Sequence, residues 1–414
     1  MSKKVVVIGG GIIGLCSAYF LAKEGNEVVI VDKSDMLDGA SYGNAGMIVP
    51  SHIIPLAQPG VIHKGIKWMF NPKSPFYIKP SANSELVKWL YNFYKNSNQT
   101  HVNNSINHLK NISFLSKELY QGFANENNSF QYDEKGLLML FQNERIAEEE
   151  IKVAEISKKL GIHVDFLDKN GIKNLEKSTT INAIGAVHYK SDAHLSPNLF
   201  ISFLKKELLK MNVQLLTNTE ILNFKFANNT IKEIITNNGI IKADSFIVSA
   251  GSWSAKILKK LDIKLLLLPG KGYSFNVPKQ AESPSIPSIL CEGKVAVTPF
   301  NTNIRFGGTL EITNTDDTKI NFKRLNGIVE HINSFYPNLK IENPKQENVW
   351  LGFRPCTPTG LPIIERSNKF NNLVIATGHA MMGLSLAPAT GKLVSEIVSN
   401  KKTTIDILAF KTSN

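Results

Sequence analysis

One arginine stands alone in an otherwise uncharged stretch near the C-terminal end of the chain. The stretch WLGFRPCTPTG, residues 350–360, holds Arg354 directly before a proline. A guanidinium in a proline-stiffened turn cannot easily reach water, so it is expected to have a fixed anionic partner. That partner is either a protein carboxylate, with Glu365 and Glu311 as candidates, or the anionic group of a ligand.

A second chemically informative stretch opens the chain. In KVVVIGGGIIGLCSAYFLAKEGNEVVIVDK, the apolar run 5–8 predicts a buried strand, residues 12–22 have helical spacing, and residues 27–31 predict a second strand. The three segments form a β-α-β unit of the size that binds nucleotides.

The turn inside this unit has the pattern G-x-G-x-x-G, formed by Gly9, Gly11 and Gly14. The first glycine permits a tight turn, the second lets the backbone approach a pyrophosphate, and the third lets the helix pack closely on the strand. Asp32 follows about 20 residues later, where a carboxylate can accept hydrogen bonds from a ribose diol. We therefore expect a dinucleotide site rather than a merely structural turn.

The elements that must position this site are spread over the chain. Residues 41–80 are rich in Pro, Gly, Asn and Ser, and strand and helix signals of nucleotide-domain type return only after Pro197. They include short alternating strands separated by Asn-rich turns, a strand before Ala250 and Gly251, and a final strand, glycine turn and helix after residue 372.

The expected fold class is therefore α/β, or α+β overall. A discontinuous Rossmann-like domain with a β-meander is predicted from residues 1–50, 195–262 and 346–414. A substrate domain with an antiparallel sheet and helices is predicted from residues 51–194 and 263–345.

Composition narrows the function classes. The 414 residues carry a formal net charge of +12, but the lysines are scattered, so binding to nucleic acid is not expected and a solvated surface is favoured. Weak contact with an anionic membrane surface, on its cytoplasmic face, is left open. Three separated cysteines fit a reducing, cytoplasmic setting without disulfides, and the nine histidines lack metal-binding spacing, so no metal is expected. No membrane-spanning helix is expected.

Several stretches together resemble the FAD-dependent D-amino-acid oxidase superfamily, and within it the bacterial D-amino-acid dehydrogenases. They are VVVIGGGIIGL, SYGNAGMIVPSHIIPLAQPGV, KGIKWMFNPKSPFYIKP, DAHLSP, LPGKGYS, WLGFRPCTPTGLPII and TGHAMMGLSLAPATGKLVSEI. The resemblance spans nearly the whole chain and implies FAD, bound without a covalent link, as the cofactor. It implies oxidative deamination of a D-amino acid, with D-proline and hydroxy-D-proline as candidates, by transfer of a hydride from Cα to flavin N5.

Individual residues also have expected roles, of which that of Arg354 is implied by the resemblance. Arg354 is expected to bind the substrate carboxylate. Tyr273 either donates to the second carboxylate oxygen or is a core aromatic, and His52 either contacts a polar group of the substrate or packs in the core. His379 is either a general base or a histidine packed at a helix start. Lys271 is expected to be solvated.

The residues expected to contact FAD form four groups. The first unit contributes Gly9, Gly11, Ile12, Ile13, Gly14, Asp32 and Lys33, and the following loop contributes Ser41, Asn44, Ala45, Gly46 and Met47. Val213 is expected near the adenine, and Ala250 and Gly251 near the pyrophosphate. The start of the last helix, expected near the pyrimidine ring of the flavin, contributes Gly378, His379, Met382, Gly383 and Leu384.

Two other functions remain open at this point. One is a glycine- or sarcosine-type amine oxidase that uses O₂, and the other is a basic nucleotide-fold protein that binds without catalysis. The electron acceptor, whether a quinone, a redox protein or O₂, and the oligomeric state are not given by the sequence.

Overall fold

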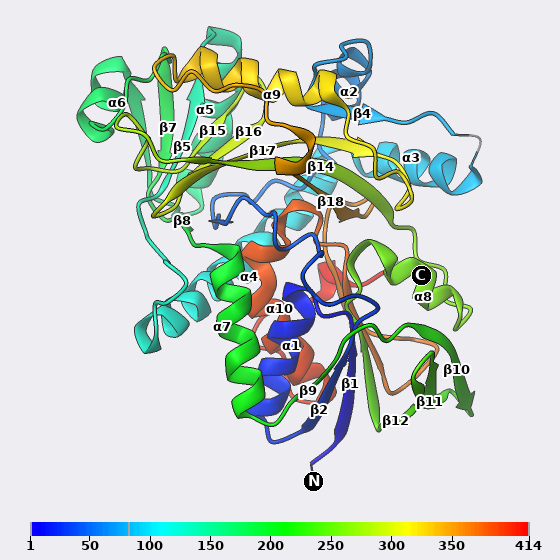
Figure 1. The fold of residues 1–414 in the computed structure, drawn as a ribbon. Coiled ribbons are helices and arrows are strands. Elements are labelled where there is room, and N and C mark those ends of the chain that lie inside the picture. Colours follow the sequence, from blue (N-terminus) through cyan, green and yellow to red (C-terminus); the bar gives the residue numbers. More distant parts are fainter. Residues whose placement is uncertain (1, 82, 413–414) are drawn as a thin grey trace.

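The strands predicted at the two ends of the chain meet in one sheet of the computed structural model, which describes residues 2–81 and 83–412 (Figure 1). This six-stranded sheet has the order β19-β20-β13-β1-β2-β9. Its strands are β19 (Ile363–Arg366), β20 (Leu373–Thr377), β13 (Ser245–Val248), β1 (Lys4–Ile8), β2 (Glu27–Val31) and β9 (Gln214–Leu216). All neighbours are parallel except β19 and β20, as expected for apolar strands that are covered on both faces.

The two faces of this sheet contribute to two different cores. Val5 and Val7 pack with four helices on one face: α1 (Ile12–Lys23), α4 (Gln99–Glu126), α7 (Pro197–Lys210) and α10 (Gly383–Val398). Val6 and Ile8 face the predicted β-meander and a short helix: β10 (Ile221–Ala227), β11 (Thr230–Thr236), β12 (Gly239–Lys242) and α8 (Ser254–Lys259). The alternation follows directly from the two-residue period of a strand.

The second large sheet has nine strands and is mostly antiparallel. Eight of them run β18 (Val349–Cys356), β14 (Leu268–Pro278), β17 (Asn303–Ile312), β16 (Val295–Pro299), β15 (Ser288–Leu290), β5 (Leu137–Phe141), β7 (Gly185–Tyr189) and β6 (Val164–Asp168), and β4 (Phe76–Ile78) pairs with β17. The sequence analysis placed β18 with the cofactor segments, but β18 pairs with β14 along its whole length and so belongs to this sheet.

Shorter elements complete the fold. They are α2 (Val61–Met69), α3 (Ser84–Asn96), α5 (Glu144–Lys159), α6 (Lys169–Leu175), α9 (Phe322–Phe335) and the two-stranded ribbon of β3 (Met47–Ile48) and β8 (Ala193–His194). Four 3₁₀ turns lie at Gly251–Trp253, Gln346–Asn348, Ala380–Met382 and Leu408–Phe410.

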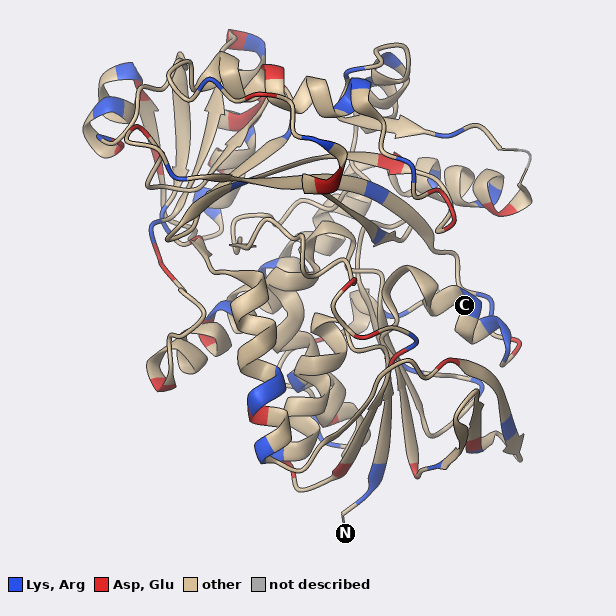
Figure 2. Cartoon of the chain, in the orientation of Figure 1, with Lys and Arg blue, Asp and Glu red and all other residues tan. Residues whose placement is uncertain are grey.

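The relative placement of the sheets sets the site. Figure 1 shows the nine-stranded sheet lying across the loops that leave the carboxyl ends of β1 and β2. In open α/β sheets, ligands bind at that edge. Figure 2 shows Lys and Arg interspersed with Asp and Glu on both halves, without a continuous basic stripe along any one element. Within the described residues, no helix combines the length and the apolar character needed to cross a bilayer.

Candidate active site

A cavity of about 1360 Å³ separates the two sheets, and most of the predicted site residues line it. From the six-stranded sheet and its loops these are Gly9, Gly11, Ile12, Ile13, Asp32, Lys33, Ser41, Asn44, Ala45, Met47, Ala250 and Gly251. From the other side and from the last helix they are His52, Tyr273, Arg354, His379, Met382, Gly383 and Leu384. Segments far apart in the sequence therefore meet around one space.

The glycine turn after β1 is built from backbone groups. Gly9 has φ of +110°, a conformation that suits glycine, and its N–H donates to the carbonyl of Val31 at 2.9 Å. A Cβ on Gly14 would lie 1.9 Å from the carbonyl oxygen of Gly9, so only glycine lets α1 approach the strand this closely. Helix α1 begins after Gly11, which provides no side-chain cap. The Ile12 N–H is taken by the Ser41 hydroxyl, so the N–H groups available for an anion are those that follow it in the first turn.

The acidic residue after β2 is held in place by the same turn. The Asp32 carboxylate accepts from the Gly10 N–H at 2.6 Å on one oxygen, and from the Ser34 N–H and hydroxyl, both at 2.9 Å, on the other. Beside it, the Lys33 ammonium lies 4.0 Å from the centre of the Trp253 ring. Ser41 accepts from the Ile12 N–H at 3.1 Å and so ties the following loop to the helix start.

Three of the glycines predicted to contact the cofactor do not line the cavity. They allow close packing of the segments around it. They are Gly14, Gly46 and Gly378. Gly46 has φ of +82° and a Cβ there would lie 2.3 Å from the Leu195 carbonyl oxygen, and Gly378 has φ of +78° with Thr357 Cγ2 at 2.6 Å. Their contribution is to the shape of the backbone rather than to a contact surface.

The prediction for Val213 is corrected by the structure. Val213 is buried in the core between α7 and β9, away from the cavity. The cavity is lined near there by Thr219, Glu220 and Ile221, which the sequence analysis missed. These residues follow the carboxyl end of β9 by a short connection, so the rule that ligands meet the carboxyl ends of parallel strands was the signal that could have found them.

Arg354 lies on β18, and no carboxylate among the described residues comes within 4 Å of its guanidinium. Both protein partners considered from the sequence are engaged elsewhere: Glu365 accepts from Thr412, and Glu311 accepts from Tyr273. The one hydrogen bond of the Arg354 guanidinium within the described chain goes from Nη1 to the carbonyl of Thr309. Burial lowers the pKa of Arg354, but an arginine stays protonated at neutral pH. Within the part of the chain that the structure describes, the cavity therefore contains a cation without a protein counter-ion.

Two residues that the sequence analysis did not single out make room for this arginine. A Cβ on Gly272 would lie 2.5 Å from the Arg354 Cζ, so the guanidinium lies across β14 only because position 272 is glycine. Thr309, whose carbonyl holds Nη1, has φ of +64°, which is strained for a β-branched residue. Such strain is typical of sites where the surrounding structure fixes a functional conformation.

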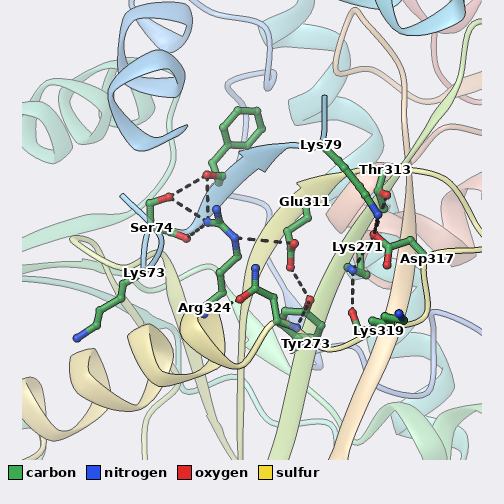
Figure 3. Close-up of polar contacts among 12 residues, drawn as sticks. Lys73, Ser74, Lys79, Lys271, Tyr273, Glu311, Thr313, Asp317, Lys319 and Arg324 are labelled. Carbon is green, nitrogen blue, oxygen red and sulfur yellow. Dashed lines mark hydrogen bonds and ion pairs between the residues drawn. The ribbon is translucent and has the colours of Figure 1, made fainter. Parts of the chain in front are cut away.

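For Tyr273 the structure favours the core-aromatic alternative, and it corrects the prediction for Lys271. The two residues lie in neighbouring clusters of polar side chains, which together we call the polar network (Figure 3). The Tyr273 hydroxyl donates to Glu311 Oε1 at 2.5 Å and accepts from the Asn321 N–H at 3.0 Å, so its hydrogen is not offered to a ligand. Lys271 is 2% exposed rather than solvated, because its ammonium lies 3.2 Å from Asp317 Oδ2 and donates to the Lys319 carbonyl at 2.8 Å.

Around this network, Arg324 fixes the segment that precedes β4. Its Nη1 donates to the Ser74 carbonyl at 2.7 Å, and its Nε lies 3.8 Å from Glu311 Oε2. Burial raises the pKa of Asp317, but hydrogen bonds from Lys79, Thr313 and Lys271 outweigh burial and lower it to about 2. The network joins β4, β14, β17 and the start of α9 behind the cavity wall (Figure 3).

The two predicted histidines differ in their surroundings. His379 is 3% exposed, and its Nε2 lies 2.9 Å from the Thr390 hydroxyl inside the core. Burial lowers the pKa of His379 to about 3, which fits a neutral histidine packed at a helix start better than a general base. His52 is only partly buried, and its Nδ1 lies 3.1 Å from the Ser51 hydroxyl.

The residues around the cavity suit a dinucleotide with an aromatic ring system. The glycine turn offers backbone N–H groups for phosphates, and Asp32 offers carboxylate oxygens for a ribose. At the other end α10 begins after Met382 without a side-chain cap, and its first turn lines the cavity. The positive end of that helix can stabilise negative charge on a bound ring. Among the described residues, no cluster of His, Cys, Asp and Glu has the arrangement of a metal site.

Comparisons with known proteins agree with this reading of the cavity. The family model described as FAD-dependent oxidoreductase matches residues 4–397. A D-amino acid dehydrogenase of Helicobacter pylori is 30% identical over 399 residues, covering 96% of this chain and 95% of that protein.

Solved structures give the same fold at lower identity. The glycine oxidase from Geobacillus kaustophilus is 21% identical with a TM-score of 0.78, covering 100% of this chain and 98% of that one. The L-proline dehydrogenase from P. horikoshii is 22% identical with a TM-score of 0.76, covering 99% and 96%.

Proposed function

The chain belongs to the FAD-dependent oxidoreductase family, and from this premise we propose that it oxidises the C–N bond of a D-amino acid. FAD is the cofactor, and the protein is an FAD-dependent amine or amino-acid oxidoreductase. This removes the alternative of a basic binding protein without catalysis. The observation that carries the proposal is the Arg354 guanidinium, a partly buried cation that lines the cavity and has no carboxylate beside it among the described residues.

Arg354 supplies the anchor for the substrate carboxylate. A guanidinium has five N–H donors in a rigid fork, and Thr309 occupies one of them. The remaining donors can bind a carboxylate with two parallel hydrogen bonds, which fixes both the position and the orientation of the adjacent α-carbon. Orientation of this kind supplies much of the rate enhancement in hydride transfer.

The cofactor cradle completes the arrangement. Bound FAD supplies a hydride acceptor at N5, so the chain itself has to bind, orient and exclude water. Gly9, Gly11 and the start of α1 are proposed to hold the pyrophosphate, and Asp32 the ribose. The N-terminus of α10 lies on the same cavity and would favour the negative charge that a reduced ring acquires.

The substrate is proposed from the relatives. The Helicobacter pylori relative is named for D-amino acids, and the P. horikoshii structure is named for L-proline. D-proline and hydroxy-D-proline are therefore the first substrates to test, followed by D-amino acids with linear side chains. A glycine or sarcosine substrate is the competing proposal, because the same fold occurs in glycine oxidase.

The decisive experiment is anaerobic mixing of the yellow holoenzyme with a panel of D- and L-amino acids, prolines, glycine and sarcosine. Bleaching of the flavin by D-amino acids at least tenfold faster than by their L-enantiomers would support the proposal. Preferential bleaching by glycine or sarcosine would instead support the amine oxidase, and the absence of bleaching by any member would contradict both.

The electron acceptor is a separate question. Stoichiometric peroxide in air would identify O₂ as the acceptor, whereas turnover that depends on a quinone or a dye would identify a dehydrogenase. The flavin is proposed to be non-covalent, since all three cysteines are buried and Cys16 lies inside α1. Release of FAD into the supernatant after denaturation tests this point.

A weak membrane contact is proposed for the surface formed by α2 and α3. Five large apolar side chains are exposed there: Ile66, Phe70, Val87, Tyr91 and Tyr94. Exposed lysines Lys67, Lys88 and Lys95 lie in the same helices. Aromatic and basic groups together suit an anionic lipid surface. Sedimentation with anionic but not with zwitterionic vesicles would support the contact.

A further inference from the structure

Two segments distant in the sequence join a buried carboxylate to the wall of the cavity. The ribbon of β3 and β8 pairs Met47 with His194 and brings Ser51 beside Asp192. The Ser51 hydroxyl donates to Asp192 Oδ2 at 2.5 Å, and the Ser51 N–H donates to Oδ1 at 3.0 Å. Ser51 is 3% exposed and Asp192 is fully buried, so water does not compete for these bonds.

The next residue, His52, is connected to this pair. Its Nδ1 lies 3.1 Å from the Ser51 hydroxyl oxygen. A serine hydroxyl has one hydrogen, and Asp192 takes it, so Ser51 can only accept from His52. Nδ1 must therefore carry the hydrogen of the neutral ring, and Nε2 is left with a free lone pair.

The other ring nitrogen is not engaged by the protein. No hydrogen bond of Nε2 occurs among the described residues, and His52 is one of the residues that line the cavity. Burial lowers the pKa of His52 to about 4, so the ring is neutral at pH 7.

We propose that Asp192 and Ser51 hold His52 in the Nδ1–H tautomer so that Nε2 accepts a proton from the ammonium group of the bound amino acid. This rests on the proposed function, because it assigns the proton acceptor for that substrate. In the step, one ammonium N–H bond breaks and an Nε2–H bond forms, without change of oxidation state. The amine becomes neutral, as loss of a hydride from its α-carbon requires, and the imidazolium later returns the proton to solvent. Asp192 and Ser51 are positioning residues, since neither touches the substrate.

Charged groups on four neighbouring elements act on this triad. Glu150 of α5 favours the imidazolium and Lys294, in the turn before β16, opposes it, and the two are paired at 2.9 Å. Lys117 of α4 favours the Asp192 carboxylate, and Tyr189 of β7 lies near it. Because Glu150 and Lys294 are paired, their opposite effects on His52 partly offset each other.

The direction of hydrogen-bond donation along Asp192, Ser51 and His52 depends on pH. Burial raises the pKa of Asp192 to about 7, although the Ser51 hydrogen bonds oppose the rise. Above that pH the carboxylate accepts from Ser51 and the tautomer is Nδ1–H. Below it a protonated Asp192 can donate to Ser51, which then donates to Nδ1 and moves the histidine hydrogen to Nε2.

The first test measures the tautomer and does not need a substrate. The FAD-loaded enzyme is labelled with ¹⁵N-histidine, and its long-range ¹H–¹⁵N spectrum is recorded at pH 8. The His52 signals are identified by their loss in His52→Gln. We expect the Nδ1–H tautomer in the wild type and its loss in Ser51→Ala, which keeps the backbone bond to Asp192. Ser105→Ala removes another buried serine hydroxyl, which donates within α4, and serves as the control. An Nε2–H tautomer in the wild type, or the same tautomer in Ser51→Ala, would overturn the proposal.

The second test measures anaerobic flavin reduction against pH. At pH 7.5 both Ser51→Ala and His52→Gln should be about 10²-fold slower than the wild type, the usual effect of losing a general base. The deficit should shrink about tenfold per pH unit as the substrate amine deprotonates in solution, whereas a folding defect would not recover. A deficit constant from pH 7 to 10 would overturn the proton transfer. If no amino acid bleaches the wild type at any pH, the proposed function fails, and the tautomer measurement still decides the Asp192–Ser51–His52 arrangement.

Discussion

The two walls of the cavity are built by different means. The wall on the six-stranded sheet is a turn of glycines whose backbone N–H groups and close packing create the cradle, and its parts lie within one short β-α-β unit. The wall on the nine-stranded sheet depends on side chains. Arg354 and Tyr273 line the cavity, and Tyr273, Glu311 and Arg324 are joined by a hydrogen bond and an ion pair across two strands and a helix (Figure 3).

This difference predicts different sensitivities. A backbone cradle tolerates changes in neighbouring side chains but not an added Cβ at a tight contact. A wall built from side chains is destabilised when a charged group loses its partner or its space, because an unpaired buried charge raises the free energy of the folded protein. Substitutions in the glycine turn should therefore weaken FAD binding. Substitutions in the wall on the nine-stranded sheet should impair substrate oxidation or lower the stability of the protein.

The largest effect is expected from Gly14→Val. The first atom of the new side chain would lie 1.9 Å from the Gly9 carbonyl oxygen and force α1 away from β1. The Kd for FAD should rise by about 10³-fold or more, which is about 4 kcal/mol, in a fluorescence titration of the apoprotein. Gly122→Ala, at a helical glycine with open space, should leave the Kd unchanged. A yellow, fully loaded Gly14→Val protein would show that the cradle is not the cofactor site.

Gly272→Ala sharpens the comparison on the other wall. Its Cβ would meet the Arg354 guanidinium at 2.5 Å and displace it. FAD binding should be retained, while kcat/KM for the amino acid falls by about 10²-fold, near 3 kcal/mol. Gly307→Ala on the neighbouring strand has only ordinary contacts, with Ser274 Cβ at 3.6 Å, and should lose much less. Equal losses of kcat/KM in the two variants would show that residue 272 does not control the position of Arg354.

Glu311→Gln tests the polar network behind Arg354. The variant keeps the shape of the side chain but leaves Arg324 without its carboxylate. The free energy of unfolding should fall by about 2 kcal/mol, as expected for hydrogen bonds and ion pairs to a buried charge, in urea denaturation of the holoenzyme. Glu330→Gln breaks an exposed ion pair with Lys73 and should cost less than about 0.5 kcal/mol. An unchanged free energy of unfolding in Glu311→Gln would show that the polar network does not stabilise this wall.

The smallest effect is a pH dependence in the cradle. The pKa of His379 is lowered to about 3, so between pH 6.5 and 3 the unfolded chain binds a proton that the folded chain does not. Stability should fall as the pH decreases through this window, by about 1 kcal/mol per pH unit from this group. His379→Gln should lose less stability than the wild type between pH 7 and 5.5. Parallel stability curves would show that His379 does not stay neutral in the folded state.

The wall built from backbone groups could be predicted from the sequence better than the wall built from side chains. The β-α-β unit, its glycines and Asp32 were predicted because a backbone site leaves its pattern within a short stretch. The prediction that Val213 lies near the adenine was wrong. A strand predicted near the cofactor does not show which of its residues faces the cavity. The lone charge in an uncharged stretch singled out Arg354 and the resemblance suggested its ligand, but the sequence could not show that both candidate carboxylates would be occupied elsewhere.

The remaining errors lie where long-range contacts decide. Lys271 was expected in solvent, and the residues that bury it, Asp317 and Lys319, follow it by more than forty positions. Gly272 lies inside the stretch LPGKGYS that was recognised, yet its role depends on a strand pairing with β18 that the sequence does not reveal. Asp192 and Ser51 meet only because β3 pairs with β8.

The central claim is that Arg354 binds the substrate carboxylate. The most direct measurement is a cycle of two enzymes and two substrates: anaerobic flavin reduction of the wild type and of Arg354→Met by the best amino acid and by the amine that lacks its carboxylate. We predict that the wild type prefers the amino acid by about 10³-fold and that Arg354→Met, still yellow, prefers it by less than about tenfold. An unchanged preference in Arg354→Met would contradict the claim.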